Sequence, residues 1–218
     1  MLSSAEILVI FDLDFTLIDN SHAIFRSFEF ALKQFHLPAP QKEQILKKIG
    51  IPLKTMFLDY LDENNAEKAV HYFREYYREH YYEGVRILPG SINILEKLKK
   101  LGYKLALLTS KKTEYAIKLL EHINLKNYFE FIQGEQPNLP PKPNPASIHL
   151  ILTKFQGIKK AFMIGDHLVD CLAAKKAGIN FIGVLTGIIS ERELRQCAGE
   201  AGIILKSIAD LDPFNHLL

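Results

Sequence analysis

The chain has 218 residues, of which 48% are hydrophobic and 24% are charged, and its 27 lysines and arginines against 25 aspartates and glutamates leave a formal net charge of +2. This composition is typical of a folded globular protein and excludes intrinsic disorder. The near balance of charge provides no basic field of the kind that neutralises nucleic-acid phosphates, so we expect no nucleic-acid partner.

No apolar stretch approaches the roughly 20 residues of a membrane helix, and the first residues lack a basic region followed by an apolar one. We therefore expect neither a membrane span nor secretion. The two cysteines, Cys171 and Cys197, do not form a CxxC pair. We expect no disulfide framework and no thiolate metal site, as is typical of a cytoplasmic protein.

Short apolar runs indicate the strands of a parallel sheet, because they are continuous rather than alternating and so suit strands covered on both faces. They lie at residues 7–11, 105–108, 161–164, 181–184 and 203–205, with a weaker candidate at 128–132. Helical patterns occur between them, at residues 92–98, 115–123, 148–155 and 168–177. This alternation predicts an α/β fold with a doubly wound parallel sheet.

Residues 20–84 show helical periodicity and no good strand. Apolar spacing predicts amphipathic helices at 24–35 and 66–81, and Pro52 can begin another helix that runs through Leu61. We expect an all-helical domain at 20–84, inserted into an α/β core domain formed by residues 1–19 and 85–218.

Polar residues gather where the predicted strands end, which is where an open parallel sheet binds its ligand. Several carboxylates converging there would repel one another without a counter-charge, and a hard cation such as Mg²⁺ resolves the repulsion. Hydroxyl, backbone N–H and ammonium groups supply donors for an oxyanion, for which phosphate is the natural guest. These residues are Asp12, Asp14 and Thr16, then Thr109 and Ser110, then Lys142 in a proline-rich loop, and finally Asp166 and Asp170.

The sequence resembles the haloacid-dehalogenase-like (HAD) hydrolase superfamily in four motifs, in order and spacing. The motifs are Asp12-Leu13-Asp14-Phe15-Thr16, Leu108-Thr109-Ser110, Lys142-Pro143-Asn144-Pro145 and Gly165-Asp166-His167-Leu168-Val169-Asp170. The helical insertion lies where that superfamily places a helical cap, and the segment 183–187 is similar to the phosphoglycolate-phosphatase-like branch. The first and last motifs are the specific part of the resemblance.

The resemblance implies a Mg²⁺-dependent phosphatase of small phosphorylated metabolites that forms an aspartyl-phosphate. Asp12 is then the nucleophile, and Asp14 protonates the leaving oxygen and later activates water. Mg²⁺ is held by Asp12, the Asp14 main-chain carbonyl and Asp166. Asp170 either binds the metal directly or supports the residues that bind it. The phosphate contacts fall to Thr109, Ser110 and Lys142, and Lys142 also offsets the charge of Asp12.

Two positions depart from the resemblance. Phe15 stands where this branch most often has Gly, and His167 stands where a small hydroxyl residue is more usual. We expect Phe15 to narrow the entrance for the leaving group. In the insertion, the segment Gly50-Ile51-Pro52-Leu53-Lys54 resembles one that faces the active site in related caps, which makes Lys54 a candidate specificity residue; the alternative is a solvated lysine.

Other functions stay open. A phosphomutase, pyrophosphatase or nucleotidase of the same superfamily would use the same site, and a non-catalytic phospho-binding or signalling module also carries acidic strand ends, a Thr and a Lys on a parallel sheet. Asp14 argues against a dehalogenase, which needs no second acid. Asp170 on its own could simply be an acidic residue in the first turn of a helix. We expect a monomer or homodimer, and leave the physiological substrate open.

Overall fold

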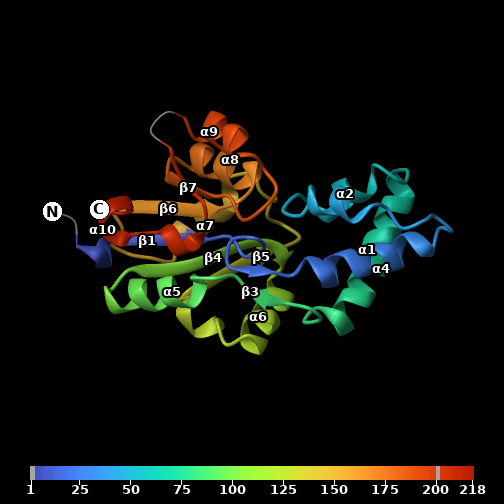
Figure 1. Cartoon of the computed structure of the whole chain (residues 1–218), viewed down its shortest axis with the longest axis horizontal. Coiled ribbons are helices and arrows are strands. Elements are labelled where there is room, and N and C mark those ends of the chain that lie inside the picture. The colour runs from blue at the N-terminus through green and yellow to red at the C-terminus, as the bar shows by residue number, and fades with distance from the viewer. Residues whose placement is uncertain (1–2, 200–201) are drawn as a thin grey trace. The chain divides into compact units, whose positions relative to one another are not determined.

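The computed structural model describes residues 3–199 and 202–218, and the chain forms two compact units (Figure 1). The first unit combines Met1–Ile18 with Ile87–Leu218, and the second is Asp19–Arg86. The short strands β2 (Ile18–Asp19) and β3 (Arg86–Ile87) pair where the chain passes between the units.

A six-stranded sheet forms the centre of the first unit, and its neighbouring strands pair in parallel. In sheet order the strands are β5 (Phe131–Glu135), β4 (Lys104–Lys112), β1 (Ile7–Phe11), β6 (Lys160–Gly165), β7 (Asn180–Val184) and β8 (Ile203–Leu205). All five residues of β1 are buried, as its continuous apolar run predicts. The predicted α/β fold is confirmed. The chain winds outward in both directions from β1, and in sheets of this kind ligands bind at the carboxyl ends of the strands where the winding reverses.

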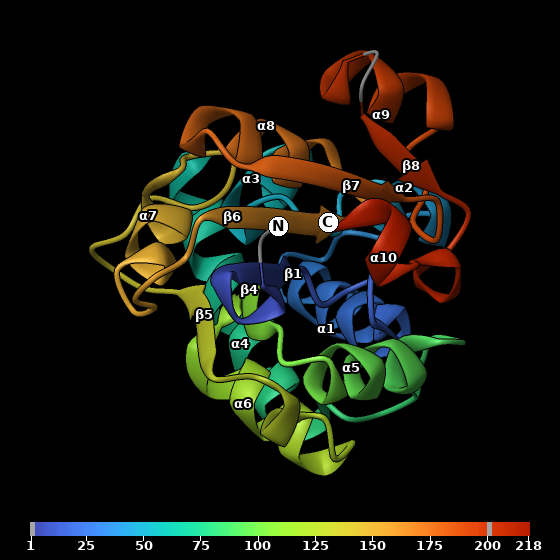
Figure 2. The same cartoon turned by 90° about the vertical axis from the view of Figure 1, so that its left-hand side faces the viewer.

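Helices cover both faces of the sheet (Figure 2). They are α5 (Ser91–Lys100), α6 (Thr113–His122), α7 (Ala146–Leu152), α8 (Leu168–Ala177), α9 (Glu191–Ala198) and α10 (Pro213–His216). Alternate residues of β1 serve the two faces. Leu8 and Ile10 join Ile148 and Cys171 in the core beneath α7 and α8, whereas Phe11 contacts Phe129 edge to face. None of the helices in the described residues combines the length and apolar character that crossing a bilayer needs.

The fifth strand of the sheet lies later in the chain than its apolar run suggests. Residues 126–128 form a 3₁₀ turn, and β5 starts only at Phe131. The strand continues through Gln133 and Gly134, and the Gln133 side chain is fully buried. Because a buried polar residue and a glycine interrupt the apolar run, the sequence pattern does not reveal the carboxyl half of this strand.

The second unit is helical and is built on aromatic packing. Its helices are α1 (Ser21–Lys33), α2 (Lys42–Leu46), α3 (Leu53–Phe57) and α4 (Glu63–His80). Phe28 of α1 stacks on Phe57 of α3 with ring centroids 4.1 Å apart, and Phe57 meets Phe73 of α4 edge to face. Two details differ from expectation. The short α2 buries only Ile45 and so leaves no periodic pattern, and the helix after Pro52 stops at Phe57.

A disulfide joins Cys171 of α8 to Cys197 of α9, with their Cα atoms 6.4 Å apart. The expectation of no disulfide framework is therefore wrong. The two residues are 26 positions apart, and only the packing of α8 and α9 against the same core brings them together.

We expect Cys197→Ser to lower the free energy of unfolding by about 3 kcal/mol under oxidising conditions, because the cross-link restricts the unfolded chain over a loop of this length. Urea unfolding of both proteins, with and without reductant, measures the difference. Reductant should abolish the difference in the free energy of unfolding between the two proteins. The expectation is contradicted if the difference persists in reductant, or if there is no difference without reductant.

Candidate active site

The turn after β1 fixes the first two acidic residues. The Asp12 N–H donates to the Ile164 carbonyl at 2.8 Å, which extends the pairing of β1 with β6 by one residue. Asp14 forms an isolated bridge with Ile18, and the Phe15 N–H donates to the Ile18 carbonyl at 2.6 Å. The backbone of this turn is therefore held on both sides, and Asp12 and Asp14 leave it from fixed positions.

Phe15 occupies the left-handed region, with φ of +57°. A residue with a β-carbon is disfavoured there, which explains why glycine suits this position. The Thr186 hydroxyl donates to the Phe15 carbonyl and holds the turn from the loop after β7. Such strain persists only where the surroundings determine the backbone, and it is typical of functional turns.

Lys142 joins two of the carboxylates. It lies in the loop between β5 and α7, and its Nζ is 2.6 Å from Asp12 Oδ1 and 2.6 Å from Asp170 Oδ1. The exposed fraction of the three side chains is 2% for Lys142, 8% for Asp12 and 1% for Asp170. Burial alone would lower the pKa of Lys142, but the charges of Asp12 and Asp170 outweigh it and raise that pKa. The ammonium therefore stays charged and bonded to both.

One ammonium does not balance the carboxylates around it. Burial raises the pKa of Asp12 to about 7, and the charges of Asp170 and Asp14 add to this effect while Lys142 opposes it. Burial also raises the pKa of Asp166, and the charges of Asp12 and Asp170 reinforce that rise. The raised pKa values indicate a site that lacks positive charge.

The acidic cluster suits a metal ion. Asp12, Asp166 and Asp170 each offer a carboxylate oxygen, and these oxygens lie within 4.8 Å of one another. The Thr16 hydroxyl donates to Asp166 Oδ1 at 3.4 Å, and a β-carbon built on Gly187 would collide with Asp166 Oδ2. Buried oxygen donors with surplus negative charge fit a hard divalent cation, whose charge would lower the pKa of these carboxyls again.

The start of α8 places Asp170 with respect to the sheet. Asp170 Oδ2 accepts from the His167 N–H at 3.2 Å, and His167 Nδ1 accepts from the Val169 N–H at 3.2 Å, so the histidine caps the helix as a hydroxyl residue would. A β-carbon built on Gly165 would collide with the Asp170 carboxylate. Asp170 therefore both closes the first turn and reaches Lys142.

A second lysine was missed by the sequence analysis. Lys111 Nζ lies 2.7 Å from Asp14 Oδ2, and the side chains are only 9% and 13% exposed. Lys111 follows Thr109 and Ser110 on β4, and its N–H donates to Thr109 Oγ1 at 3.2 Å. Its place just after a predicted strand end was the available signal, but a lysine there is usually solvated.

The first unit places seven of the nine sequence-predicted site residues at the carboxyl edge of its sheet, in addition to Phe15 in the turn after β1. The seven are Asp12, Asp14, Thr109, Ser110, Lys142, Asp166 and Asp170.

Lys54 belongs to the second unit, at the start of α3. Its Nζ lies 2.5 Å from Glu63 Oε1 and 2.8 Å from Glu67 Oε1. Hydrogen bonds to these two carboxylates raise the pKa of Lys54. Lys54 is therefore an ion-paired lysine of the helical unit.

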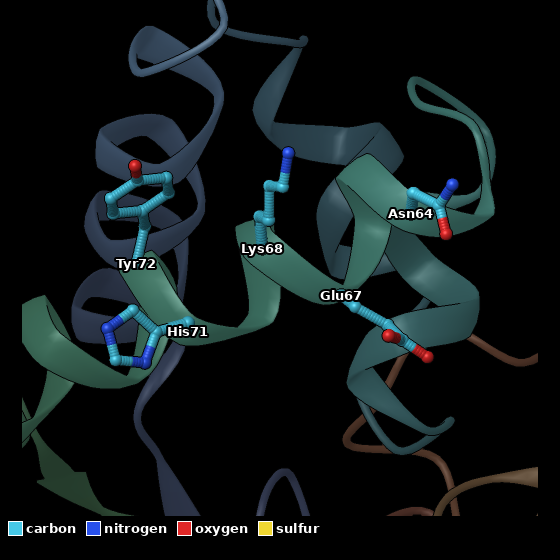
Figure 3. Close-up of a pocket in the computed structure, with 5 residues that line it drawn as sticks. All are labelled: Asn64, Glu67, Lys68, His71 and Tyr72. Carbon is cyan, nitrogen blue, oxygen red and sulfur yellow. The ribbon is translucent and has the colours of Figure 1, made fainter.

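The structure also has an open hollow of about 540 Å³ on α4. Its lining residues are Asn64, Glu67, Lys68, His71 and Tyr72 (Figure 3). Figure 3 shows these side chains spread along a single helix without converging on one point. None of them is a predicted site residue, and the hollow has no arrangement of a nucleophile with a base.

The fold and the site define an α/β enzyme with a buried acidic cluster at the edge of a parallel sheet. The chain belongs to the haloacid dehalogenase-like hydrolase family, whose family model matches residues 9–184. It is similar to the probable phosphatase IndB of Dickeya dadantii, at 33% identity over 97% of this chain and 94% of the relative. It is also similar to a phosphoglycolate phosphatase of Aquifex aeolicus, at 31% identity over 83% of this chain and 85% of the relative.

Solved structures support the same family. A predicted phosphatase from Clostridium acetobutylicum superposes with a TM-score of 0.83 and 32% identity, covering 92% of this chain and 94% of that one. The resemblance on which the sequence analysis relied is confirmed, and the match covers residues of both units.

We expect Lys142→Met to lower the free energy of unfolding by about 3–5 kcal/mol in EDTA, because it leaves buried carboxylates without their ammonium partner. Urea unfolding measures this loss. Lys104→Met is the matched control, since the ion pair of Lys104 with Glu130 is about 40% exposed on both sides and contributes at most about 1 kcal/mol. Equal losses in the two variants contradict the expectation.

Proposed function

We propose that the protein is a Mg²⁺-dependent phosphatase that hydrolyses small phosphorylated metabolites through an aspartyl-phosphate. The observation that carries this proposal is the pair of carboxylates Asp12 and Asp14 on one fixed turn, ion-paired to two different lysines, beside the buried acids Asp166 and Asp170. The names of the relatives support the same reaction class.

In this proposal Asp12 attacks phosphorus, so that an oxygen–phosphorus bond forms to Asp12 as the bond to the leaving oxygen breaks. Asp14, which enters this step in its protonated form, gives its proton to that oxygen. Asp14 then takes a proton from the water that attacks the aspartyl-phosphate, which releases phosphate and regenerates the Asp12 carboxylate. Lys142 supports the first step because its ammonium, 2.6 Å from Asp12, favours the ionised nucleophile.

Asp12, Asp166 and the Asp14 main-chain carbonyl would hold Mg²⁺. When bound, the metal supplies positive charge that neutralises phosphoryl oxygens. We propose that Asp170 supports the metal site without binding the metal itself, because its two oxygens already accept hydrogen bonds from Lys142 and from the His167 N–H. Thr109 and Ser110 donate hydrogen bonds to the phosphate, at the end of β4.

We assign residues 1–19 and 85–218 to the catalytic core and residues 20–84 to a helical cap that selects the substrate, with Lys54 as a candidate contact. Phosphoglycolate is the first substrate to test, because a relative carries that name; pyrophosphate, nucleoside monophosphates and sugar phosphates are the alternatives. We further propose a cytoplasmic monomer or homodimer.

Turnover of p-nitrophenyl phosphate tests the function. We expect many turnovers per molecule that stop in EDTA and return with Mg²⁺, and a loss of at least about 10³-fold in kcat for Asp12→Asn, since an amide cannot act as the nucleophile. Far-UV circular dichroism shows that the variant stays folded. Near-normal activity of Asp12→Asn refutes the nucleophile, and phosphorylation of the protein without turnover favours a signalling module instead.

Substrate selectivity tests the role of Phe15. We expect Phe15→Gly to raise kcat/KM for bulky phosphate esters relative to small ones, because glycine suits the left-handed backbone and removes the ring beside Asp14. Phe214→Ala is the control, since this aromatic is 57% exposed on α10. A panel of esters with unchanged ratios would count against a gating role.

A further inference from the structure

Lys111 lies beside the proposed acid–base residue because β4 is longer than its neighbour. The pairing of β4 with β1 ends at Leu107, opposite Phe11, whereas β4 continues to Lys112. The extension runs past the end of β1 and alongside the turn that carries Asp14. Lys111 Nζ reaches Asp14 Oδ2 there at 2.7 Å.

The contact is shielded from water. Lys111 and Asp14 are 9% and 13% exposed, in contrast to most ion pairs of this chain, in which at least one side chain is 25% exposed or more. Charge-assisted hydrogen bonds in such surroundings are short and strong, and solvent screens them less than it screens a surface pair. The pair therefore determines how the Asp14 side chain points.

The two oxygens of Asp14 are not equivalent. Oδ2 is bonded to Lys111, whereas Oδ1 is buried and has no hydrogen-bond partner in the part of the chain that the structure describes. A buried acceptor without a partner is costly, so it calls for an explanation. A substrate oxygen that shares a proton with Oδ1 would supply the missing partner.

We propose that Lys111 is the positioning residue of the acid–base step: its ammonium holds Oδ2 of Asp14 and so turns Oδ1 toward the leaving oxygen of the substrate. This inference rests on the proposed phosphatase function and assigns Lys111 no contact with the reacting atoms. Both ends of the ion pair are anchored, since the Phe15 N–H bonds to Ile18 on one side and the Lys111 N–H bonds to Thr109 on the other.

The two lysines of the site pair with different carboxylates. Lys142 bonds to Asp12 and Asp170, and Lys111 bonds to Asp14. Loss of Lys111 therefore affects proton transfer to the leaving group, while the nucleophile keeps its own ammonium.

Dependence on the leaving group tests this inference. A proton from Asp14 matters for an alkyl phosphate, whose alkoxide is a poor leaving group, and matters little for p-nitrophenyl phosphate, whose phenolate leaves without one. We expect Lys111→Met to lower kcat by about 10²-fold for an alkyl phosphate that the wild type hydrolyses, and by less than about 10-fold for p-nitrophenyl phosphate, with KM little changed. Lys111→Arg keeps the cation and should restore most of the alkyl phosphate activity.

Two comparisons separate the possible failures. Asp14→Asn should show the same contrast between substrates; if it does not, the acid–base role in the proposed function fails, and this inference fails with it. If Asp14→Asn shows the contrast but Lys111→Met lowers both substrates equally, raises only KM or changes nothing, the positioning role alone is overturned. Lys104→Met, at the opposite end of β4, should leave both rates unchanged.

Discussion

Mutual repulsion among buried carboxylates is the constraint on which this structure depends. Asp12, Asp166 and Asp170 are buried and bring their oxygens within 4.8 Å of one another. Such a cluster can stay ionised only if positive charge lies beside it, and Lys142 supplies one such charge by bonding to Asp12 and Asp170 together. The surrounding fold holds Lys142 and the three acids at these distances.

The doubly wound sheet brings these groups together from distant parts of the chain. β1 lies between β4 and β6, so the turn after β1 meets the ends of both neighbours. Local compromises accompany this arrangement. Phe15 takes a left-handed backbone, and Gly165 and Gly187 leave room for carboxylates that a β-carbon would strike. The packing around the sheet holds Phe15 in this unfavourable conformation and restricts the other two positions to glycine.

Continuous apolar runs predicted most of the sheet, because parallel strands covered on both faces need apolar side chains throughout. β5 was misplaced because Gln133 is buried within it, and α2 was missed because one turn of helix has no period. The acidic residues could be found because they follow strands directly. The disulfide and the pairing of Lys111 with Asp14 could not, because both arise from the packing of segments 26 and 97 positions apart.

The net negative charge of the site favours binding of the proposed metal ion. When all four carboxylates are ionised, the two ammonium groups leave two negative charges, and one divalent cation would neutralise them. Asp166 is where that cation is needed, since it has no lysine or arginine at ion-pair distance in the described residues and a hydroxyl from Thr16 as its side-chain donor. Without the cation, burial and repulsion raise the pKa of Asp12 and Asp166. In the proposed mechanism, metal binding would therefore also favour the ionised form of Asp12, the proposed nucleophile.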